Sequence, residues 1–413
     1  MEVYYLGLDW ADEAHAVWVV DGRGEKVWAG EVEQTAEGLS EFGRRLYEWG
    51  SAGVEVWAAL EKPEGRIVDF LLDHGVVVYP VNPKAVDRAR DRFRVSSSKS
   101  DPFDARVLAD FLRTDHGHLR PLTPNSAQAQ ELKLLTSDHQ RLLHQQTRIL
   151  NQLVATLKEY YPRMVETFTD LNTAAALDFL ERYPAPSALG ELTPEAWQEF
   201  VAAHRWHKER ADRLWQRLKE PQLPIPEHVV RAKSRLVRAL VAELRVVRTA
   251  VADYHAEIEG FFGSMPAAEV ARSLPAGKSG VIIPMVWAEL GDAPGRWESF
   301  RHLQAQAGTV PVTQRSGKYK LTQFRFACNK RLRHALDLLA FASLRHSAWA
   351  MAYYRQQRGR GHRHHEALRA LAAKWLKIIF VIWDRHVLYN EDRHANNIAR
   401  QGNNQAIPSP TGA

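Results

Sequence analysis

Four carboxylates in the N-terminal third of the sequence stand where apolar segments end or where a helical pattern begins. Asp9 ends a β-branched and aromatic run, and Glu61 follows the apolar run 54–60. Asp101 and Asp104 open the segment DPFDARVLADFL, three residues apart and therefore on one helix face. Alone, Asp9 or Glu61 is most simply a surface carboxylate, and Asp101 is most simply a helix N-cap. Together they supply four hard oxygen donors, which favour Mg²⁺, and two such ions can activate an attacking oxygen and stabilise a leaving one.

A serine in the C-terminal third stands among cations. Ser316 lies in the segment TQRSGKYK, beside Arg315, Lys318 and Lys320. In a glycine-containing basic loop, a serine is most often a turn residue or a phosphate contact. A nucleophilic serine would need its proton removed and the developing charge stabilised, and the three cations could hold a phosphate. The residues alone leave both roles open.

These cations belong to a longer segment without acids. No Asp or Glu occurs between Glu298 and Asp337, and Glu366 is the only one between Asp337 and Asp384. A solvated basic face would normally intersperse acids, so a polyanionic partner, most commonly nucleic acid, is predicted. The predicted nucleic-acid contacts are Arg315, Lys318, Lys320, Arg325, Lys330 and Arg331.

The elements that must position the carboxylates alternate between strand and helix patterns. Strands are predicted over 3–8, 16–20, 27–32, 54–60 and 76–81, with helices over 39–49 and 67–72. The turn Asp21-Gly22-Arg23-Gly24 joins the second and third strands as a hairpin. Three strands joined by tight turns, then strands alternating with helices, predict a ribonuclease-H-like mixed sheet in an α+β protein.

Beyond this region the pattern becomes helical. Apolar residues follow heptad spacing from Leu132 to Leu153 and from Val230 to Ile258, so two long helices are predicted to pair with each other or across subunits as a coiled coil. The section from about 270 to 400 is predicted to be helical around one long irregular segment, Gly308 to Lys320. The predicted domains are 1–122, 123–265 and 266–400, followed by a disordered polar tail, 401–413.

Composition narrows the class of protein. The 413 residues include 45% hydrophobic and 25% charged side chains, as in ordinary globular proteins, and the formal net charge is +6. A single cysteine, Cys328, excludes an internal disulfide and fits a reducing compartment. No signal peptide and no apolar run long enough to cross a bilayer is visible, so a cytoplasmic protein without a membrane partner is expected.

Several longer motifs resemble one family of mobile-element enzymes, the DEDD transposases of the insertion-sequence family numbered one-hundred-and-ten. The resemblance rests on EKPEGRIVDFLLDHGVVVYPVNPKAVDRARDRF, KSDPFDARVLADFLRTD, LPAGKSGVIIPMVWAELGD, AGTVPVTQRSGKYK and NKRLRHALDLLAFASLRHSAWAMAYY, and it covers nearly the whole chain. One motif departs from the family, because Pro275-Ala276-Gly277-Lys278 stands where Pro-Gly-Ile-Gly is usual, which weakens a phosphate contact there.

The resemblance implies roles for individual residues. Asp9, Glu61, Asp101 and Asp104 match the family's four acidic metal ligands, for two Mg²⁺ ions, and Ser316 matches its catalytic serine. It further implies a resolvase-like N-terminal domain, a mainly helical C-terminal transposase domain and strand exchange through a phosphoserine link. A structured bridge RNA would guide a homo-oligomer, a dimer or tetramer, to double-stranded donor and target DNA.

Two other functions stay open at this point. The first is a purely hydrolytic nuclease, similar to a Holliday-junction resolvase, in which Ser316 only contacts phosphate. The second is a nucleic-acid-binding protein whose catalytic centre is inactive. A covalent protein–DNA adduct distinguishes the first alternative from a recombinase, and metal-dependent cleavage distinguishes the second.

Overall fold

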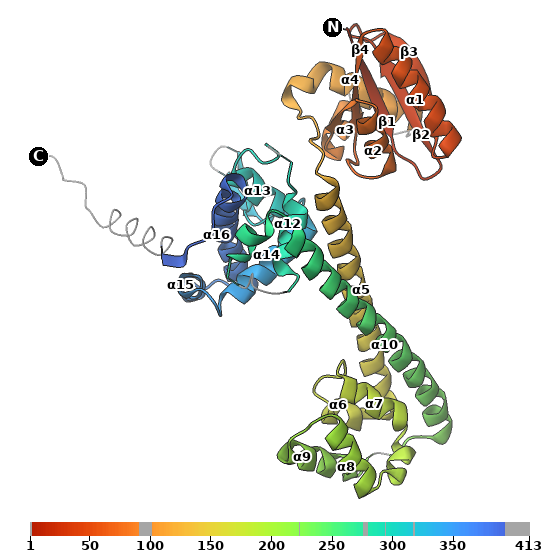
Figure 1. Cartoon of the computed structure of the whole chain (residues 1–413), viewed down its shortest axis with the longest axis vertical. Helices are drawn as coiled ribbons and strands as arrows, with labels where there is room; N and C mark the ends of the chain where they lie inside the picture. The colour runs from red at the N-terminus through yellow and green to blue at the C-terminus, as the bar shows by residue number, and fades with distance from the viewer. Residues whose placement is uncertain are drawn as a thin grey trace, which may run out of the picture. The chain divides into compact units, whose positions relative to one another are not determined.

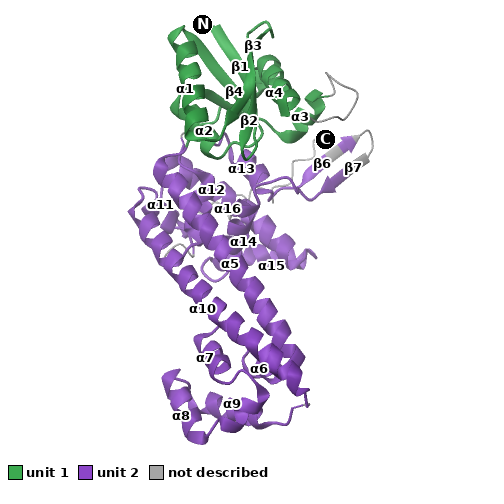
Figure 2. Ribbon diagram, turned by 90° about the vertical axis from the view of Figure 1, so that its right-hand side faces the viewer, with its two compact units in different colours: residues 1–124 green, residues 125–413 purple. Residues whose placement is uncertain are grey.

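The protein divides into two compact units, residues 1–124 and 125–413, which are described separately (Figure 2). The computed structural model describes residues 2–90, 101–222, 224–275, 280–293, 295–316 and 319–392. Lys318, positions 276–278 of the departing motif and the predicted tail at 401–413 lie outside the described residues. The division falls two residues beyond the first predicted domain boundary, and the predicted middle and C-terminal domains share the second unit.

Unit 1 is built on a five-stranded sheet. Its strands are β1 (Glu2–Asp9), β2 (Ala14–Val20), β3 (Lys26–Glu33), β4 (Val54–Leu60) and β5 (Val77–Pro80). The order is β3-β2-β1-β4-β5; β2 is antiparallel to β1 and β3, whereas β1, β4 and β5 are mutually parallel. The predicted mixed sheet is confirmed, and its order and strand directions fit a ribonuclease-H-like fold.

The connections follow from local sequence. Between β2 and β3 the Asp21 side chain accepts hydrogen bonds from the backbone N–H groups of Arg23 (2.9 Å) and Glu25 (2.8 Å), and Gly24 takes φ +86°. This turn reverses the chain within four residues, as a hairpin requires. Parallel strands instead need a crossover, which helices supply after β3 and β4.

Helices cover both faces of the sheet. They are α1 (Ala36–Ser51), α2 (Arg66–Asp73), α3 (Pro83–Arg90), α4 (Asp101–Asp115) and the short η1 (His116–His118). Alternate strand residues point to opposite faces. Leu6 and Leu8 of β1 therefore pack with α1 and α2 in one core, while Tyr5 packs with α3 and α4 in the other. The candidate carboxylates belong to the side of the sheet that α4 covers.

Two long helices, α5 (Ala127–Tyr160) and α10 (Glu227–Ser264), pack along each other within unit 2 (Figure 1). Heptad positions predicted from the sequence form the seam, since Ile149 and Leu153 of α5 and Leu240 and Leu244 of α10 share one core. Shorter elements lie between them in the chain: α6 (Pro162–Thr167), α7 (Ala174–Arg182), η2 (Pro186–Glu191), α8 (Pro194–Ala203) and α9 (Lys208–Lys219). In this chain the two helices pair with each other.

The remainder of unit 2 is helical with one hairpin. The elements are α11 (Ala268–Arg272), α12 (Ile282–Leu290), α13 (Phe300–Ala307), β6 (Val312–Ser316), β7 (Tyr319–Gln323), α14 (Lys330–Ser343), α15 (Ala348–Gly359) and α16 (His364–Arg385). Trp375, Leu336 and Trp287 lie in the core of this region. None of the helices among the described residues combines the length and apolarity needed to cross a membrane.

The β6–β7 hairpin corrects one prediction. The segment from Gly308 to Lys320 was expected to be irregular, but it contains β6 and the start of β7, paired antiparallel from Val312 opposite Gln323 to Ser316 opposite Tyr319. The strands are five residues each and mostly polar, so they lack the apolar alternation that identifies longer strands. Their β-branched and aromatic residues, such as Thr313 and Tyr319, supply the strand preference instead.

Candidate metal centre and catalytic serine

Two of the predicted carboxylates lie at the same edge of the sheet. Asp9 is the last residue of β1, and Glu61 directly follows the last residue of β4. Because β1 and β4 are adjacent and parallel, their carboxyl ends lie side by side. Both positions continue the alternation of Tyr5 and Ala59, which face α3 and α4. The sheet therefore presents Asp9 and Glu61 on the face that α4 covers.

Gly7 allows α4 to approach this face closely. A Cβ atom at Gly7 would lie 1.9 Å from the carbonyl oxygen of Ala105 and 2.5 Å from the backbone nitrogen of Ala109, so no other residue fits without moving the helix. Asp101 and Asp104 occupy the first turn of α4. The contact at Gly7, two residues before Asp9, thus fixes the start of α4 beside the strand ends.

The charges of these four residues act on one another. The pKa of Asp9 is raised to about 6, first by burial and then by the negative charges of Asp104, Asp101 and Glu61, against a smaller lowering by Arg90. A carboxyl group is shifted this way when it is partly desolvated among like charges. The structure therefore brings together the four carboxylates that the sequence singled out.

Arg90, the last residue of α3, is a member of this cluster that the sequence did not reveal. Its Nε donates to Asp104 Oδ1 at 2.7 Å, its Nη2 lies 3.8 Å from Glu61 Oε1, and it also pairs with Asp87. Burial lowers the pKa of Arg90, but its hydrogen bond to Asp104 and the nearby acids outweigh this and leave the pKa above its usual value. No spacing signal marks Arg90 among the neighbouring arginines, because its role depends on how α3 meets α4.

The donor set suits a hard divalent cation. Asp9 is held with a raised pKa among other carboxylates, a situation that a bound cation would relieve. Asp104, which is buried, is paired with Arg90. Throughout the described ranges, no three or more His, Cys, Asp or Glu side chains are already arranged to hold a metal ion. The residue types and charges fit a metal, and Asp104 would exchange its partner on binding.

Ser316 lies in unit 2, at the end of β6. The backbone register places it opposite Tyr319, the first residue of β7, and places Arg315 opposite Lys320. Arg315 is exposed. Figure 2 shows β6 and β7 as a two-stranded ribbon that stands off from the helices of unit 2. The serine is therefore carried at the turn end of a ribbon with cations in its sequence, which suits contact with an extended polyanion.

The other predicted nucleic-acid contacts differ in what they touch. Lys330, the first residue of α14, is exposed, and Arg325 is partly buried with no hydrogen-bond acceptor for its Nε among the described residues. Arg331 instead contacts other parts of the chain: its Nε lies 2.9 Å from Glu289 Oε1, and its Nη2 donates to the Lys133 carbonyl at 3.0 Å. Arg331 thus joins α14 to α12 and α5, while Lys330 and Arg325 remain suited to a phosphate backbone.

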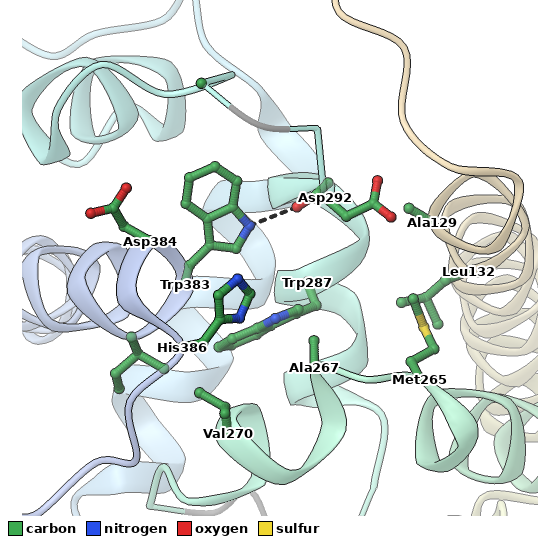
Figure 3. A pocket seen from close by; sticks show the side chains of 13 residues that line it. Ala129, Leu132, Met265, Ala267, Val270, Trp287, Asp292, Trp383, Asp384 and His386 are labelled. Atoms are coloured by element: carbon green, nitrogen blue, oxygen red, sulfur yellow. Dashed lines mark hydrogen bonds between the residues drawn. The ribbon is translucent and has the colours of Figure 1, made fainter.

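A separate cavity of about 260 Å³ lies among α5, α12 and α16 (Figure 3). Leu132, Met265 and Trp287 give it apolar walls, and Trp383 closes one side with its indole N–H donating to the Gly291 carbonyl at 2.7 Å. None of the residues predicted to act in catalysis or nucleic-acid binding lines it. This cavity belongs to the helical core of unit 2 and not to the candidate metal centre or the β6–β7 ribbon.

Comparison with known proteins agrees with this arrangement. Residues 6–162 match a family model of DEDD transposases, and residues 269–355 match the model described as "Transposase IS116/IS110/IS902 family". A relative from Streptomyces coelicolor, "Mini-circle putative transposase for IS117", is 32% identical over 90% of this chain and 92% of its own length. The "Insertion element IS900 uncharacterized 42 kDa protein" of Mycobacterium paratuberculosis is 25% identical over 94% of this chain and 97% of its length.

The mixed sheet with its acidic edge, the basic helical unit and these matches define a class: enzymes that cut and transfer DNA strands during transposition. Within that class the match to the IS117 protein extends over nearly the full length of both chains. The chain belongs to the IS110 family of insertion-sequence transposases.

Proposed function

We propose that this transposase cleaves and exchanges DNA strands with two Mg²⁺ ions and a serine nucleophile, guided by a structured RNA and acting as a homo-oligomer, a dimer or tetramer. The observation that carries the proposal is the convergence of four carboxylates on one edge of the unit 1 sheet, together with the raised pKa of Asp9 that results from it. A cluster of this kind is unfavourable for a protein that has no use for a cation there.

Asp9, Glu61, Asp101 and Asp104 would hold the ions. When bound, the ions would stabilise the charge on the attacking and leaving oxygens of a phosphodiester. In the protein itself, Arg90 compensates the charge of Asp104 and holds its carboxylate in place at 2.7 Å. Gly7 keeps α4 close enough for Asp101 and Asp104 to act with the strand ends.

Ser316 would attack the phosphorus of a DNA phosphodiester. A bond forms between Ser316 Oγ and phosphorus, the bond to a deoxyribose oxygen breaks, and the proton lost by the serine ends on that oxygen. The hydroxyl of a second strand then reverses the step, so the phosphodiester is rebuilt and the serine is released. Arg315, Lys318 and Lys320 would neutralise the phosphate during both steps. The family resemblance and the position of Ser316 beside Arg315 support this role.

The basic segment of unit 2 supports nucleic-acid partners in general. The exposed Lys330 suits phosphate oxygens of donor DNA, target DNA or guide RNA, and the partly buried Arg325 adds positive charge beside it. The RNA requirement follows from the family resemblance. Sequencing of RNA that co-purifies with the full chain tests it: a single structured RNA species is expected, and a random sample of cellular RNA would contradict it.

One observation favours a second candidate, a hydrolytic nuclease. All four carboxylates lie in unit 1, so a metal centre can form there without Ser316. Mass spectrometry of DNA trapped on the wild-type chain separates the two reactions. An adduct on Ser316 that disappears in Ser316→Ala is expected. Cleavage that continues normally in Ser316→Ala, or an adduct on another residue, would assign the protein to the hydrolytic class.

A subunit-mixing experiment sharpens the proposal. Ser316→Ala and Asp104→Asn should each abolish strand exchange while preserving the fold, because one removes a hydroxyl and the other only a charge. If the serine of one subunit acts with the carboxylates of another, mixed oligomers should regain activity. Mixtures as inactive as either variant alone would show that one chain must supply both.

A further inference from the structure

The loop that follows β7 displays an aromatic ring to solvent. Phe326 is 77% exposed, the largest exposed fraction among the large hydrophobic side chains of the described residues. Its ring meets the edge of Phe324, with centroids 4.9 Å apart and planes at 79°. Single exposed hydrophobic residues are common at protein surfaces, so this ring is informative only together with the residues around it.

Two arginines, Arg333 and Arg369, support the residues next to Phe326. The Arg333 guanidinium lies 4.5 Å from the Phe324 ring centroid, and that of Arg369 lies 4.3 Å from it. Arg333 also donates to the Arg325 carbonyl at 2.5 Å and contacts Cys328. Arginines of α14 and α16 therefore contact the residues on either side of Phe326. These contacts restrain the backbone that carries the exposed ring.

Three cations lie next to this loop: Arg325 and Lys330 lie within four residues of Phe326 in the sequence, and Arg369 contacts the Phe324 ring. The Nε atoms of Arg325 and Arg369 are buried and lack an acceptor within the described part of the chain. Lys330 is exposed at the start of α14, four residues beyond Phe326. The segment 299–336 contains no acid, whereas Asp337 and Glu366 lie near Arg369 and balance part of its charge. An exposed ring beside Arg325 and Lys330, in a segment free of acids, matches a ligand with a flat face and anionic oxygens.

We propose that Phe326 stacks on the base of an unpaired DNA nucleotide, while Arg325 and Lys330 contact the adjoining phosphates. This inference rests on the proposed function, because the loop continues directly from the ribbon that carries Ser316 and strand exchange leaves bases near the cut transiently unpaired. Aromatic rings bind single strands in this way regardless of sequence, since every base has a π-face. In an intact duplex the faces of the bases are covered by neighbouring base pairs, so the ring cannot stack on them.

The test uses the full chain and a thymidine homopolymer that carries one 2-aminopurine. Wild-type protein should quench the probe by stacking. Phe326→Ala should weaken binding on the order of ten-fold, from about 1–3 kcal/mol per stacked base, without changing the dependence of affinity on salt. Phe326→Tyr should retain both quenching and affinity. Lys330→Ala should instead flatten the salt dependence. Phe341→Ala, which removes a ring that is 50% exposed on α14, is the matched control and should bind as wild type.

Three results would overturn the inference. Equal losses in Phe326→Ala and Phe341→Ala would show a general effect of surface aromatics. A smaller molecular mass of Phe326→Ala in solution would make the ring a contact between copies of the chain. A loss confined to a uridine homopolymer would assign the ring to RNA. Ser316→Ala should quench the probe as wild type does, so failure of the nucleophile assignment and failure of the stacking assignment are separately visible.

Discussion

The acidic edge of unit 1 and the β6–β7 ribbon of unit 2 present their chemistry by different means. At the acidic edge, parallel strands, a tightly packed helix and an arginine fix four carboxylates against their mutual repulsion. On the ribbon, Ser316 ends a five-residue strand that is paired with one neighbouring strand. The first is a candidate cation site whose geometry depends on packing. The second places Ser316 in a basic segment of the sequence, and among the described residues its strand is supported by one partner strand.

Of the changes that test this difference between the two regions, Gly7→Ala should have the largest effect. Gly7→Ala should destabilise unit 1 by about 3 kcal/mol or more and abolish strand cleavage, because the new Cβ overlaps backbone atoms of α4. Thermal unfolding and a cleavage assay measure the two effects. Gly22→Ala is the matched control, because nothing lies within 4 Å of the added atom there. Normal activity in Gly7→Ala would mean that α4 need not sit this close to β1.

Two neighbouring cations on α14 separate structural from nucleic-acid roles. Arg331→Ala should lower the stability of unit 2 by about 3 kcal/mol, because it leaves the buried carboxylate of Glu289 without its ion pair. Lys330→Ala should leave stability unchanged and reduce the salt dependence of DNA binding by about one counterion. Circular dichroism melts and binding isotherms at several salt concentrations measure the difference. Equal melting temperatures would show that Arg331 is dispensable for the fold.

The smallest effect concerns charge repulsion at the acidic edge. Asp9→Asn should stabilise unit 1 without added metal by about 1 kcal/mol, since the carboxylate is half exposed and solvent screens part of the shift in its pKa. Mg²⁺ should stabilise the wild type more than the variant, so the difference should shrink as Mg²⁺ is added. A variant less stable than wild type in metal-free buffer would indicate that Asp9 is not strained by its neighbours.

The two regions also differ in how far sequence alone predicts them. Asp9 and Glu61 were identifiable because apolar strands carry a readable pattern, and residues at adjacent parallel strand ends must meet. Gly7 and Arg90 were not, because a close helix–strand approach and a helix-end ion pair depend on three-dimensional packing. The heptads of α5 and α10 predicted a helical seam but not whether it forms within one chain or between two.

The strands β6 and β7 were not predicted, and the reason is a different one. Its strands are short and polar, so neither length nor alternation separated them from a loop, although Ser316 itself was singled out. Arg331 was grouped with Lys330 because both lie in the same basic run. Burial of Glu289 on α12 is what distinguishes them, and nothing in the spacing of the basic residues reveals that partner.

The most direct test of the acidic edge compares two aspartates of α4. Asp104 is buried among the carboxylates, whereas Asp110 on the same helix pairs with Arg113 at 2.6 Å. Asp104→Asn should lower Mg²⁺-dependent strand cleavage roughly a thousand-fold or more, because several kcal/mol of transition-state stabilisation depend on the ions. Asp110→Asn should cleave as wild type, and both variants should still bind DNA. Cleavage by Asp104→Asn at the wild-type rate would contradict the assignment of these carboxylates as the metal centre.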